Sequence, residues 1–365
     1  MTIKRLYIVL GFWAALCRVE AQSDTLRLIF TGDIMGHTPQ IKSAEVSPGK
    51  YDYTPCFQFV KKPLSDADLA VGNLELTLPG KSPYTGYPMF RSPDALATAL
   101  KDAGIDVMVT ANNHSNDSRA LGVTNTIETL RTEGFWQTGT FKNKKERDVF
   151  YPLMVYKDNF KLAFLNYTYG TNGVPTEAPT IVNLLDTVQM AADFAEARAR
   201  KPHFIIAVVH WGLEYQLTEN AEQRALARFM MREGADMIIG MHPHVVQPLK
   251  MESYKGKKVL VAYSLGNFIS NQQQPNTDGG IMVQTELILK KGAAKATLGD
   301  YGYIPVWRYI HKGSKKTAYY AIPTYLADEM NTLFPEMPEV AVAKMKAFAT
   351  ALRKRLGADA EWTKK

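Results

Sequence analysis

Residues 235–244 read ADMIIGMHPH, an apolar run typical of a buried strand that ends in two histidines. His242 and His244 lie two positions apart, so in an extended segment their imidazoles point to the same side. Two imidazoles placed in this way can bind one metal ion or two neighbouring ions. Taken alone, the same stretch is also compatible with a turn that carries two surface histidines.

Four other apolar runs end in polar residues of the kinds that bind metals. LRLIFTG precedes Asp33, LAVG precedes Asn73-Leu74-Glu75, IDVMVT precedes Ala111-Asn112-Asn113-His114, and FIIAVV precedes His210-Trp211-Gly212. The carboxyl ends of the strands in an open α/β sheet converge on one crevice, so these residues are expected to meet there. Singly, His210 could be a hydrogen-bonded core residue and Asp33 a helix cap. Five such strand ends together predict one metal site.

The chain alternates predicted strands and helices. Strands are predicted at residues 26–31, 67–72, 105–110, 161–166, 204–209, 236–240 and 259–264. Helices are predicted between them at residues 92–104, 122–134, 186–200 and 219–233. This alternation predicts a layered α/β sandwich.

From about residue 280 the alternation stops. GIMVQTELILK and YIPVWRYI are predicted strands that extend or cap a sheet, and helices are predicted at 322–334 and 339–356. The last helix is amphipathic, so it either docks on the main domain or lies on a membrane surface. The predicted domains are a signal peptide at 1–21, a main domain at 22–300, and an extension at 301–365 packed on it.

The N-terminus has the features of an export signal. Lys4 and Arg5 precede an apolar run, LYIVLGFWAAL, that is too short to span a bilayer, and Val19-Glu20-Ala21 offers a cleavage site. The alternative is a buried N-terminal helix. Attachment of a lipid at Cys17 is another alternative, although Leu16 before it is bulky where a small residue is preferred. The protein is therefore expected to be exported to the periplasm or cell envelope.

Charge and cysteine content narrow the possible partners. The formal net charge of the 365-residue chain is +7, and removal of residues 1–21 takes away three basic residues and one acidic residue, which leaves +5. The basic residues are scattered, which suits an anionic ligand or surface and does not indicate nucleic acid. Cys56 would be the one remaining cysteine, so no internal disulfide is expected.

The ligand types at the strand ends indicate the chemistry of the site. The predicted metal ligands are Asp33, Glu75, Asn113, His210, His242 and His244. Imidazole, carboxylate and amide oxygen together suit Zn²⁺, Mn²⁺ or Fe, and six ligands favour two ions over one. His114 is the predicted proton donor to a leaving group, because Asn113 can ligate while the imidazole faces the substrate. The chain contains no phosphate-binding loop, no zincin helix and no G-x-S-x-G elbow.

Six motifs in order resemble the bacterial capsule-synthesis proteins of the CapA type, which are associated with poly-γ-glutamate. They are Thr31-Gly-Asp-Ile-Met35, Gly72-Asn-Leu-Glu75, Ala111-Asn-Asn-His114, His210-Trp-Gly-Leu-Glu214, Gly240-Met-His-Pro-His-Val245 and Ser264-Leu-Gly-Asn-Phe-Ile269. The resemblance runs from about residue 26 to 290. That family looks like a branch of the calcineurin-like metallophosphoesterases, which implies a four-layer αββα sandwich with metals at the strand ends. Within these motifs, Asn73, Glu214 and Asn267 are assigned to substrate contacts.

The chain departs from the wider superfamily at its first motif. That motif is usually D-x-H, whereas here Met35 stands where a histidine ligand is expected. His37 follows closely and either compensates for this loss or is a surface residue. Glu75, with Asn73, replaces the usual bridging aspartate.

Three functions are compatible with the sequence. The first is an exported hydrolase with two metal ions that cleaves phosphoester or amide bonds in an anionic envelope polymer or its precursor. The second is a non-catalytic component that binds or exports capsule polymer, with a vestigial or structural metal site and membrane-bound synthesis proteins as partners. The third is a periplasmic binding protein without metal.

Overall fold

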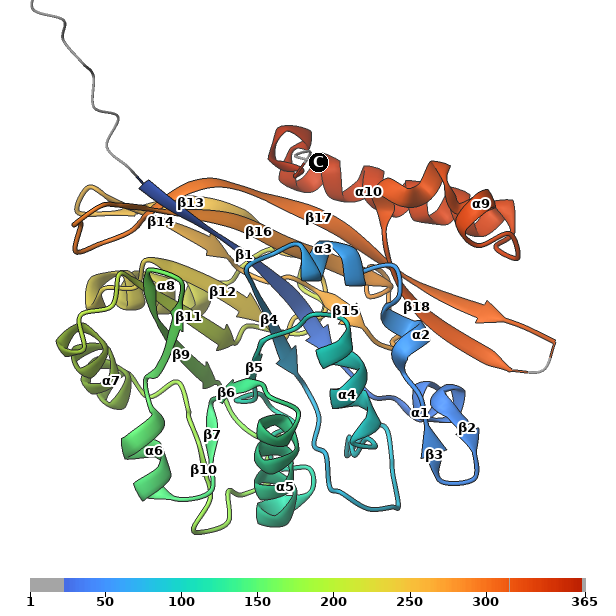
Figure 1. The fold of residues 1–365 in the computed structure, drawn as a ribbon, viewed down its shortest axis with the longest axis horizontal. Coiled ribbons are helices and arrows are strands. Elements are labelled where there is room, and N and C mark those ends of the chain that lie inside the picture. Colours follow the sequence, from blue (N-terminus) through green and yellow to red (C-terminus); the bar gives the residue numbers. More distant parts are fainter. Residues whose placement is uncertain (1–22, 315, 363–365) are drawn as a thin grey trace, which may run out of the picture.

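The computed structural model describes residues 23–314 and 316–362. Two β-sheets lie face to face in the middle of the molecule, and helices cover the outer face of each sheet (Figure 1). The predicted signal peptide at 1–21, including Cys17, lies outside the described residues.

The first sheet contains eight strands in the order β18-β17-β16-β1-β4-β5-β6, with β15 paired to β1. Its strands are β1 (Ser23–Ile34), β4 (Leu69–Leu74), β5 (Val107–Val109), β6 (Trp136–Thr138), β15 (Asn267–Ile269), β16 (Gly279–Lys290), β17 (Thr297–Lys312) and β18 (Thr317–Pro323). β1, β4, β5, β6 and β15 are parallel, and β16, β17 and β18 continue the sheet in antiparallel order.

The second sheet contains six strands in the order β13-β14-β12-β11-β9-β8. They are β8 (Leu153–Lys157), β9 (Phe160–Thr168), β11 (Phe204–His210), β12 (Met237–Met241), β13 (Leu249–Tyr254) and β14 (Lys257–Ala262). The four central strands are parallel, and β8 and β13 are antiparallel edges. Two small ribbons pair β2 (Glu45–Ser47) with β3 (Lys50–Tyr51) and β7 (Thr140–Phe141) with β10 (Ile181–Val182).

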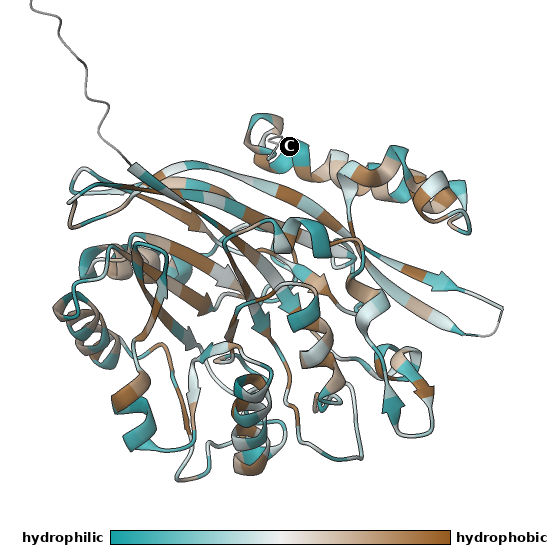
Figure 2. Ribbon diagram, viewed as in Figure 1, coloured by the Kyte–Doolittle hydropathy of each residue, from teal (hydrophilic) through white to brown (hydrophobic). Residues whose placement is uncertain are grey.

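Apolar side chains fill the space between the sheets. Phe30 and Val71 of the first sheet belong to the same buried cluster as Phe164, Ile206 and Ile239 of the second. Near-continuous apolar runs are expected for parallel strands that are covered on both faces. In Figure 2 the strands in the middle of the molecule carry brown segments between white and teal ones.

Helices complete the four layers. On the first sheet lie α1 (Thr38–Ala44), α2 (Thr54–Phe57), α3 (Lys61–Ser65) and α4 (Ala95–Asp102), and on the second lie α7 (Thr187–Ala199) and α8 (Ala221–Glu233). α5 (Arg119–Thr132) contacts β6 and β7, and α6 (Lys144–Phe150) contacts β7. The predicted four-layer αββα sandwich is therefore confirmed.

The C-terminal segment differs in one respect from the sequence-based expectation. The helix predicted over 322–334 begins two residues later and is divided: Ile322 and Pro323 end strand β18, and the 3-10 helix η1 (Thr324–Asp328) and the short helix α9 (Met330–Leu333) follow. Proline disfavours helical backbone at the residue before it, so Ile322 stays extended. The predicted helix 339–356 is correct and forms α10 (Glu339–Leu356), followed by η2 (Ala358–Ala360).

α10 packs on the antiparallel part of the first sheet. Ala341 and Met345 of this helix share a buried cluster with Trp307 and Ile322 of β17 and β18. β17 crosses residue 300, so the expected division between 22–300 and 301–365 falls within a strand. Among the helices of the described segments, none combines the length and apolar character needed to cross a bilayer.

A close approach of two strands fixes the position of Asp33. The amide of Asp33 donates to the carbonyl of Gly266 at 2.9 Å, beside the start of β15. A Cβ atom at Gly32 would lie 2.0 Å from that carbonyl oxygen. Only glycine fits at position 32 without moving one strand. Gly32 therefore allows the backbone contact that positions Asp33 in the site.

Replacement of this glycine is expected to destabilise the protein strongly. Gly32→Ala should lower the free energy of unfolding by about 2–3 kcal/mol, because the new methyl group meets backbone that cannot rotate away. Urea unfolding measures the change. Gly170→Ala is the matched control, since its Cβ would have no heavy atom within 4 Å, and it should stay within about 0.5 kcal/mol of wild type. Equal effects of the two substitutions would contradict the proposed clash.

Candidate metal centre

The predicted ligands come together at the carboxyl ends of the parallel strands of both sheets. Asp33 lies in β1, Glu75 follows β4, Asn113 follows β5, His210 ends β11, and His242 and His244 follow β12. All six are buried, with exposed fractions between 0% and 3%. The convergence predicted from the sequence is therefore present in the structure.

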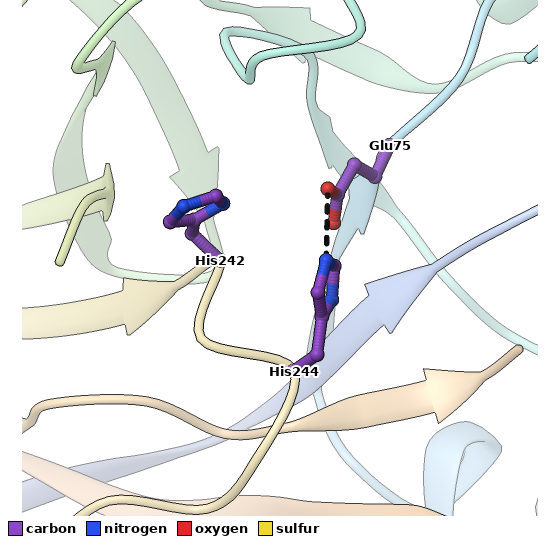
Figure 3. Close-up of side chains that lie close together, drawn as sticks. All are labelled: Glu75, His242 and His244. Atoms are coloured by element: carbon purple, nitrogen blue, oxygen red, sulfur yellow. Dashed lines mark ion pairs between the residues drawn. The ribbon is translucent and has the colours of Figure 1, made fainter. Parts of the chain in front are cut away.

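The ligands form two groups that share Glu75. One ligand atom each from Glu75, His242 and His244 lie within 4.8 Å of one another, and Asp33, Glu75 and His210 form a second group under the same limit. In Figure 3 the carboxylate of Glu75 faces the ring of His244, and the ring of His242 lies beside them. A carboxylate common to two ligand groups can hold two cations side by side.

Glu75 is the residue that most needs a cation. Both of its carboxylate oxygens are buried without a hydrogen-bond partner among the described residues. Oε1 lies 3.5 Å from Nε2 of His210 and 3.7 Å from Nε2 of His244. Burial, together with the charges of Asp33 and Glu214, raises the pKa of Glu75 well above its usual value. A cation bound there would satisfy both oxygens and restore the ionised form.

Asp33 is held as an anion. Burial alone would raise its pKa, but hydrogen bonding to His244, the charge of His244 and the amide of Asn73 together lower it. Its Oδ2 lies 3.2 Å from Nδ1 of His244 and accepts from the backbone amide of His242 at 3.2 Å. Its Oδ1 accepts from Asn73 at 2.8 Å. Asp33 is thus oriented before any metal binds.

Two of the histidines are kept neutral, which is the protonation state that binds metal. Burial lowers the pKa of His210 to about 3, and it lowers the pKa of His242 well below the usual range. Nδ1 of His242 is buried without a partner among the described residues. His242 and His244 also adopt φ angles of 98° and 58°, a left-handed conformation that non-glycine residues rarely adopt outside functional sites.

Asparagine side chains connect the ligands. Asn113 Oδ1 lies 2.7 Å from Nε2 of His210, a hydrogen-bonding distance that ties the two proposed ligands together. Asn73 contacts Asp33, as above, and receives a hydrogen bond from Asn112 at 3.3 Å. Asn267 Oδ1 lies 3.2 Å from Nδ1 of His244, so Asn267 helps to orient the His244 ring. The residues assigned to substrate contacts, Asn73 and Asn267, therefore lie against the ligands themselves.

His114 lies beside this centre in a pair with Asp117. Its Nδ1 is 2.7 Å from Oδ2 of Asp117, and its ring packs edge-on against Phe90 at a centroid distance of 4.6 Å. A carboxylate on Nδ1 fixes the tautomer and leaves Nε2 as the atom that exchanges a proton. Asp117 was not identified from the sequence, although its spacing of three residues from His114 would permit this contact.

Other residues near the centre form its rim. Glu214 is exposed and its charge acts on Glu75, whereas Tyr169 is 46% exposed and its ring lies 4.6 Å from that of His242. Burial, followed by the charges of Glu75 and Glu214, raises the pKa of Tyr169 to about 12. Tyr169 was also not identified from the sequence, because no metal-ligand pattern includes it.

Met35 and His37 lie outside both ligand groups. Met35 belongs to the apolar cluster beneath the helices of the first sheet and supplies no ligand. His37 is half-buried, its ring lies 4.9 Å from Phe90, and its Nδ1 accepts from the amide of Asn271 at 3.2 Å. His37 therefore does not restore the missing ligand of the first motif and is not a surface residue either.

The two-sheet sandwich and the histidine–carboxylate cluster at its strand ends define a four-layer α/β protein whose buried groups could hold a metal. The model of the family described as bacterial capsule synthesis protein PGA_cap matches residues 27–272, and the chain belongs to this family. The family predicted from the six motifs is confirmed.

Curated relatives agree with this assignment. The capsule biosynthesis protein CapA of Bacillus anthracis is 28% identical over 282 residues, which cover 73% of this chain and 65% of that protein. The PGA biosynthesis protein CapA of Bacillus subtilis (strain 168) is 28% identical over 287 residues, which cover 72% of this chain and 68% of that protein. The chain thus spans about two thirds of the length of these relatives.

Solved structures resemble the chain more distantly. A hypothetical protein from Thermus thermophilus aligns over 82% of this chain and 100% of its own, with a TM-score of 0.44 and 15% identity. A novel phosphatase from Mycoplasma pneumoniae aligns over 78% of this chain and 95% of its own, with a TM-score of 0.43 and 15% identity.

Removal of the Glu75 charge is expected to act in opposite directions with and without metal. In the presence of a chelator, Glu75→Gln should raise the free energy of unfolding by about 1–3 kcal/mol, because an unpaired buried carboxyl is replaced by a neutral amide of similar size. The same substitution should abolish the stabilisation that Mn²⁺ or Zn²⁺ gives the wild type. Thermal unfolding with and without metal measures both effects, and a metal-free variant less stable than wild type would contradict the interpretation.

His37 is expected to make stability depend on pH. Burial lowers its pKa to about 4 from 6.5, so between these values the unfolded chain takes up a proton that the folded chain does not. The contribution of His37 to the free energy of unfolding is therefore fully present above about pH 6.5, and it is lost as the pH falls towards 4. The loss from His37 at about pH 4.5 should be about 2–3 kcal/mol. Urea unfolding of His37→Gln should show a flatter pH dependence than wild type; identical curves would rule out this role.

Proposed function

We propose that this chain is an exported, metal-dependent hydrolase that cleaves phosphoester or amide bonds in an anionic polymer of the cell envelope, or in its precursor. The single observation that carries the proposal is the shared, buried carboxylate of Glu75, which has no hydrogen-bond partner among the described residues. Such a carboxylate is costly in a protein that binds no cation there, whereas a centre with two cations can share it between them.

The donor set fits divalent transition metals. Glu75, His242 and His244 would hold one ion, and Asp33, Glu75 and His210, with the amide oxygen of Asn113, would hold the other. Imidazole with carboxylate and amide oxygen suits Mn²⁺, Zn²⁺ or Fe. When bound, such ions would polarise a phosphoryl or carbonyl oxygen and lower the pKa of water enough to supply a nucleophile near neutral pH. Two carboxylates leave two divalent cations with a net positive charge, which favours an anionic substrate group.

Side chains of the protein supply proton transfer and orientation in the proposed hydrolysis. His114 donates a proton from Nε2 to the leaving group, while Asp117 orients the ring from the opposite nitrogen. Phe90 packs against the ring of His114 and restricts its rotation, and it also donates its backbone amide to Asp117 at 2.5 Å. The burial of the centre excludes bulk water, so charges within it interact more strongly than they would in solution.

The polymer and the compartment are inferred from the relatives and from the N-terminal sequence. Two relatives carry names for capsule and PGA biosynthesis, which supports poly-γ-glutamate or its precursor as the substrate. The export signal at 1–21 supports action in the periplasm or cell envelope, where membrane-bound synthesis proteins would be partners.

A non-catalytic role in polymer binding or export is the second candidate. The observation that favours it is Met35, which fills a core position instead of adding a ligand. The two functions differ in whether the protein with metal bound turns over a substrate, since only the hydrolase does so.

Metal analysis together with a substrate screen separates the two candidates. The purified mature protein should contain about two transition-metal ions per chain and hydrolyse some member of a panel of phosphoesters and γ-glutamyl amides. His242→Ala should lose metal, whereas His114→Asn should keep metal and lower kcat by about 10²–10⁴-fold. Asp117→Asn should shift the pH profile of kcat. Stoichiometric metal without turnover would favour the non-catalytic role, and a protein without metal would refute the hydrolase.

A further inference from the structure

Helix α8 carries a row of three arginines on one exposed face. Arg224, Arg228 and Arg232 are spaced four residues apart, and all three are exposed. In an α-helix this spacing places side chains one above the other, with successive residues rising by about 6 Å. A row of like charges at this spacing is unfavourable for the isolated helix, so it requires an explanation outside the helix.

The arginines line an open groove. Its lining residues are Ala221, Arg224, Ala225, Arg228, Phe229, Arg232 and Tyr254. Arg232 lies over the ring of Phe229, with its guanidinium carbon 5.0 Å from the ring centroid, and Tyr254 of β13 forms the opposite wall. The groove therefore combines three cationic groups with two aromatic rings.

Neighbouring acids neutralise this row only in part. Arg232 pairs with Glu233 at 3.0 Å, and Arg224 donates to the carbonyl of Glu219, whose carboxylate is already bound by Lys250 at 2.6 Å. Arg228, in the middle, makes no hydrogen bond or ion pair within residues 23–314 and 316–362. Its guanidinium is free to pair with a carboxylate from another molecule.

A second groove lies between this face and Tyr169, at the rim of the metal centre. It is lined by Tyr169, Leu185, Thr187, Glu222, Ala225, Leu226 and Phe229, so it shares Ala225 and Phe229 with the arginine groove. At its other end Tyr169 lies against His242. The order of the elements explains why this face lies near the rim of the centre. Residues 211–220 lead from the end of β11 to the start of α8, and α8 then runs back along the outer face of the second sheet (Figure 1).

We propose that the arginine groove on α8 is a binding site for a flexible carboxylate polymer, separate from the metal centre. The polymer lies along Arg224, Arg228 and Arg232 and reaches the centre past Phe229 and Tyr169. The site holds the substrate close to the reacting groups and raises its local concentration there, as a linked second binding site does. The choice of polymer and its delivery to the centre rest on the proposed function, whereas binding at the arginine groove itself requires no bound metal.

The shape of the surface favours a polymer over a membrane. A membrane-binding face presents basic residues around protruding apolar side chains, whereas here the arginines border a concave surface that continues as far as Tyr169. Guanidinium groups also match carboxylates in paired hydrogen bonds.

Binding of labelled poly-γ-glutamate to the full mature protein tests the site. Fluorescence anisotropy should show binding at about 0.05 M salt that weakens strongly at about 0.3 M. Arg224→Gln/Arg228→Gln/Arg232→Gln should weaken binding about tenfold, because three exposed ion pairs each contribute a factor of a few. The matched control is Lys62→Gln/Lys144→Gln/Lys346→Gln, which removes the same charge from α3, α6 and α10 and should change binding less than about twofold.

Three results would overturn the proposal. The first is an equal loss in both triple variants, which would show a response to net charge alone. The second is loss of binding on chelation or in His242→Ala, which would place the polymer at the metal centre only. The third is tighter, arginine-dependent binding to phosphatidylglycerol vesicles than to the polymer, which would make this face a membrane contact. Unchanged thermal unfolding of the triple variants confirms that each is folded.

Discussion

A buried carboxylate between two sheets is the constraint on which the rest of the site depends. Glu75 is fully buried, both of its oxygens lack partners among the described residues, and it lies between histidines contributed by the second sheet. A lone charge in such a place is costly, and the usual remedy is protonation or a bound cation. The raised pKa of Glu75 is the first remedy, and the two ligand groups that share it offer the second.

The fold supplies this arrangement through the meeting of parallel strand ends. β1, β4 and β5 belong to one sheet and β11 and β12 to the other, and all point their carboxyl ends toward the same region. Local backbone features then aim the side chains. Gly32 permits the contact between β1 and the segment at Gly266, and the left-handed residues His242 and His244 turn the chain after β12. Stability and site geometry therefore depend on the same few backbone positions.

Most of the site could be predicted because strand ends and ligand types are both local properties of the sequence. An apolar run followed by His210 or by Asp33 is visible within ten residues, and the α/β rule then brings the runs together. Asp117 and Tyr169 could not be found in this way, because their roles depend on distances to His114 and His242 across turns and sheets. The arginine row was within reach of the sequence, because a helix is predicted over 219–233 and a spacing of four residues then places the three side chains on one face.

The replacement of a histidine by Met35 reduces the number of protein ligands at the centre. Met35 is buried in the apolar cluster beneath the helices of the first sheet and offers no ligand atom. Asp33 keeps its orientation through Asn73, His244 and the amide of His242, and none of these contacts involves position 35. An ion bound by Asp33, Glu75 and His210 would therefore have fewer protein ligands and more room for water or substrate oxygen. Such an open position is a feature of catalytic metal sites, whereas structural sites are closed by protein ligands. The substitution is thus compatible with a working centre, and the orientation of Asp33 favours that interpretation over a decayed one.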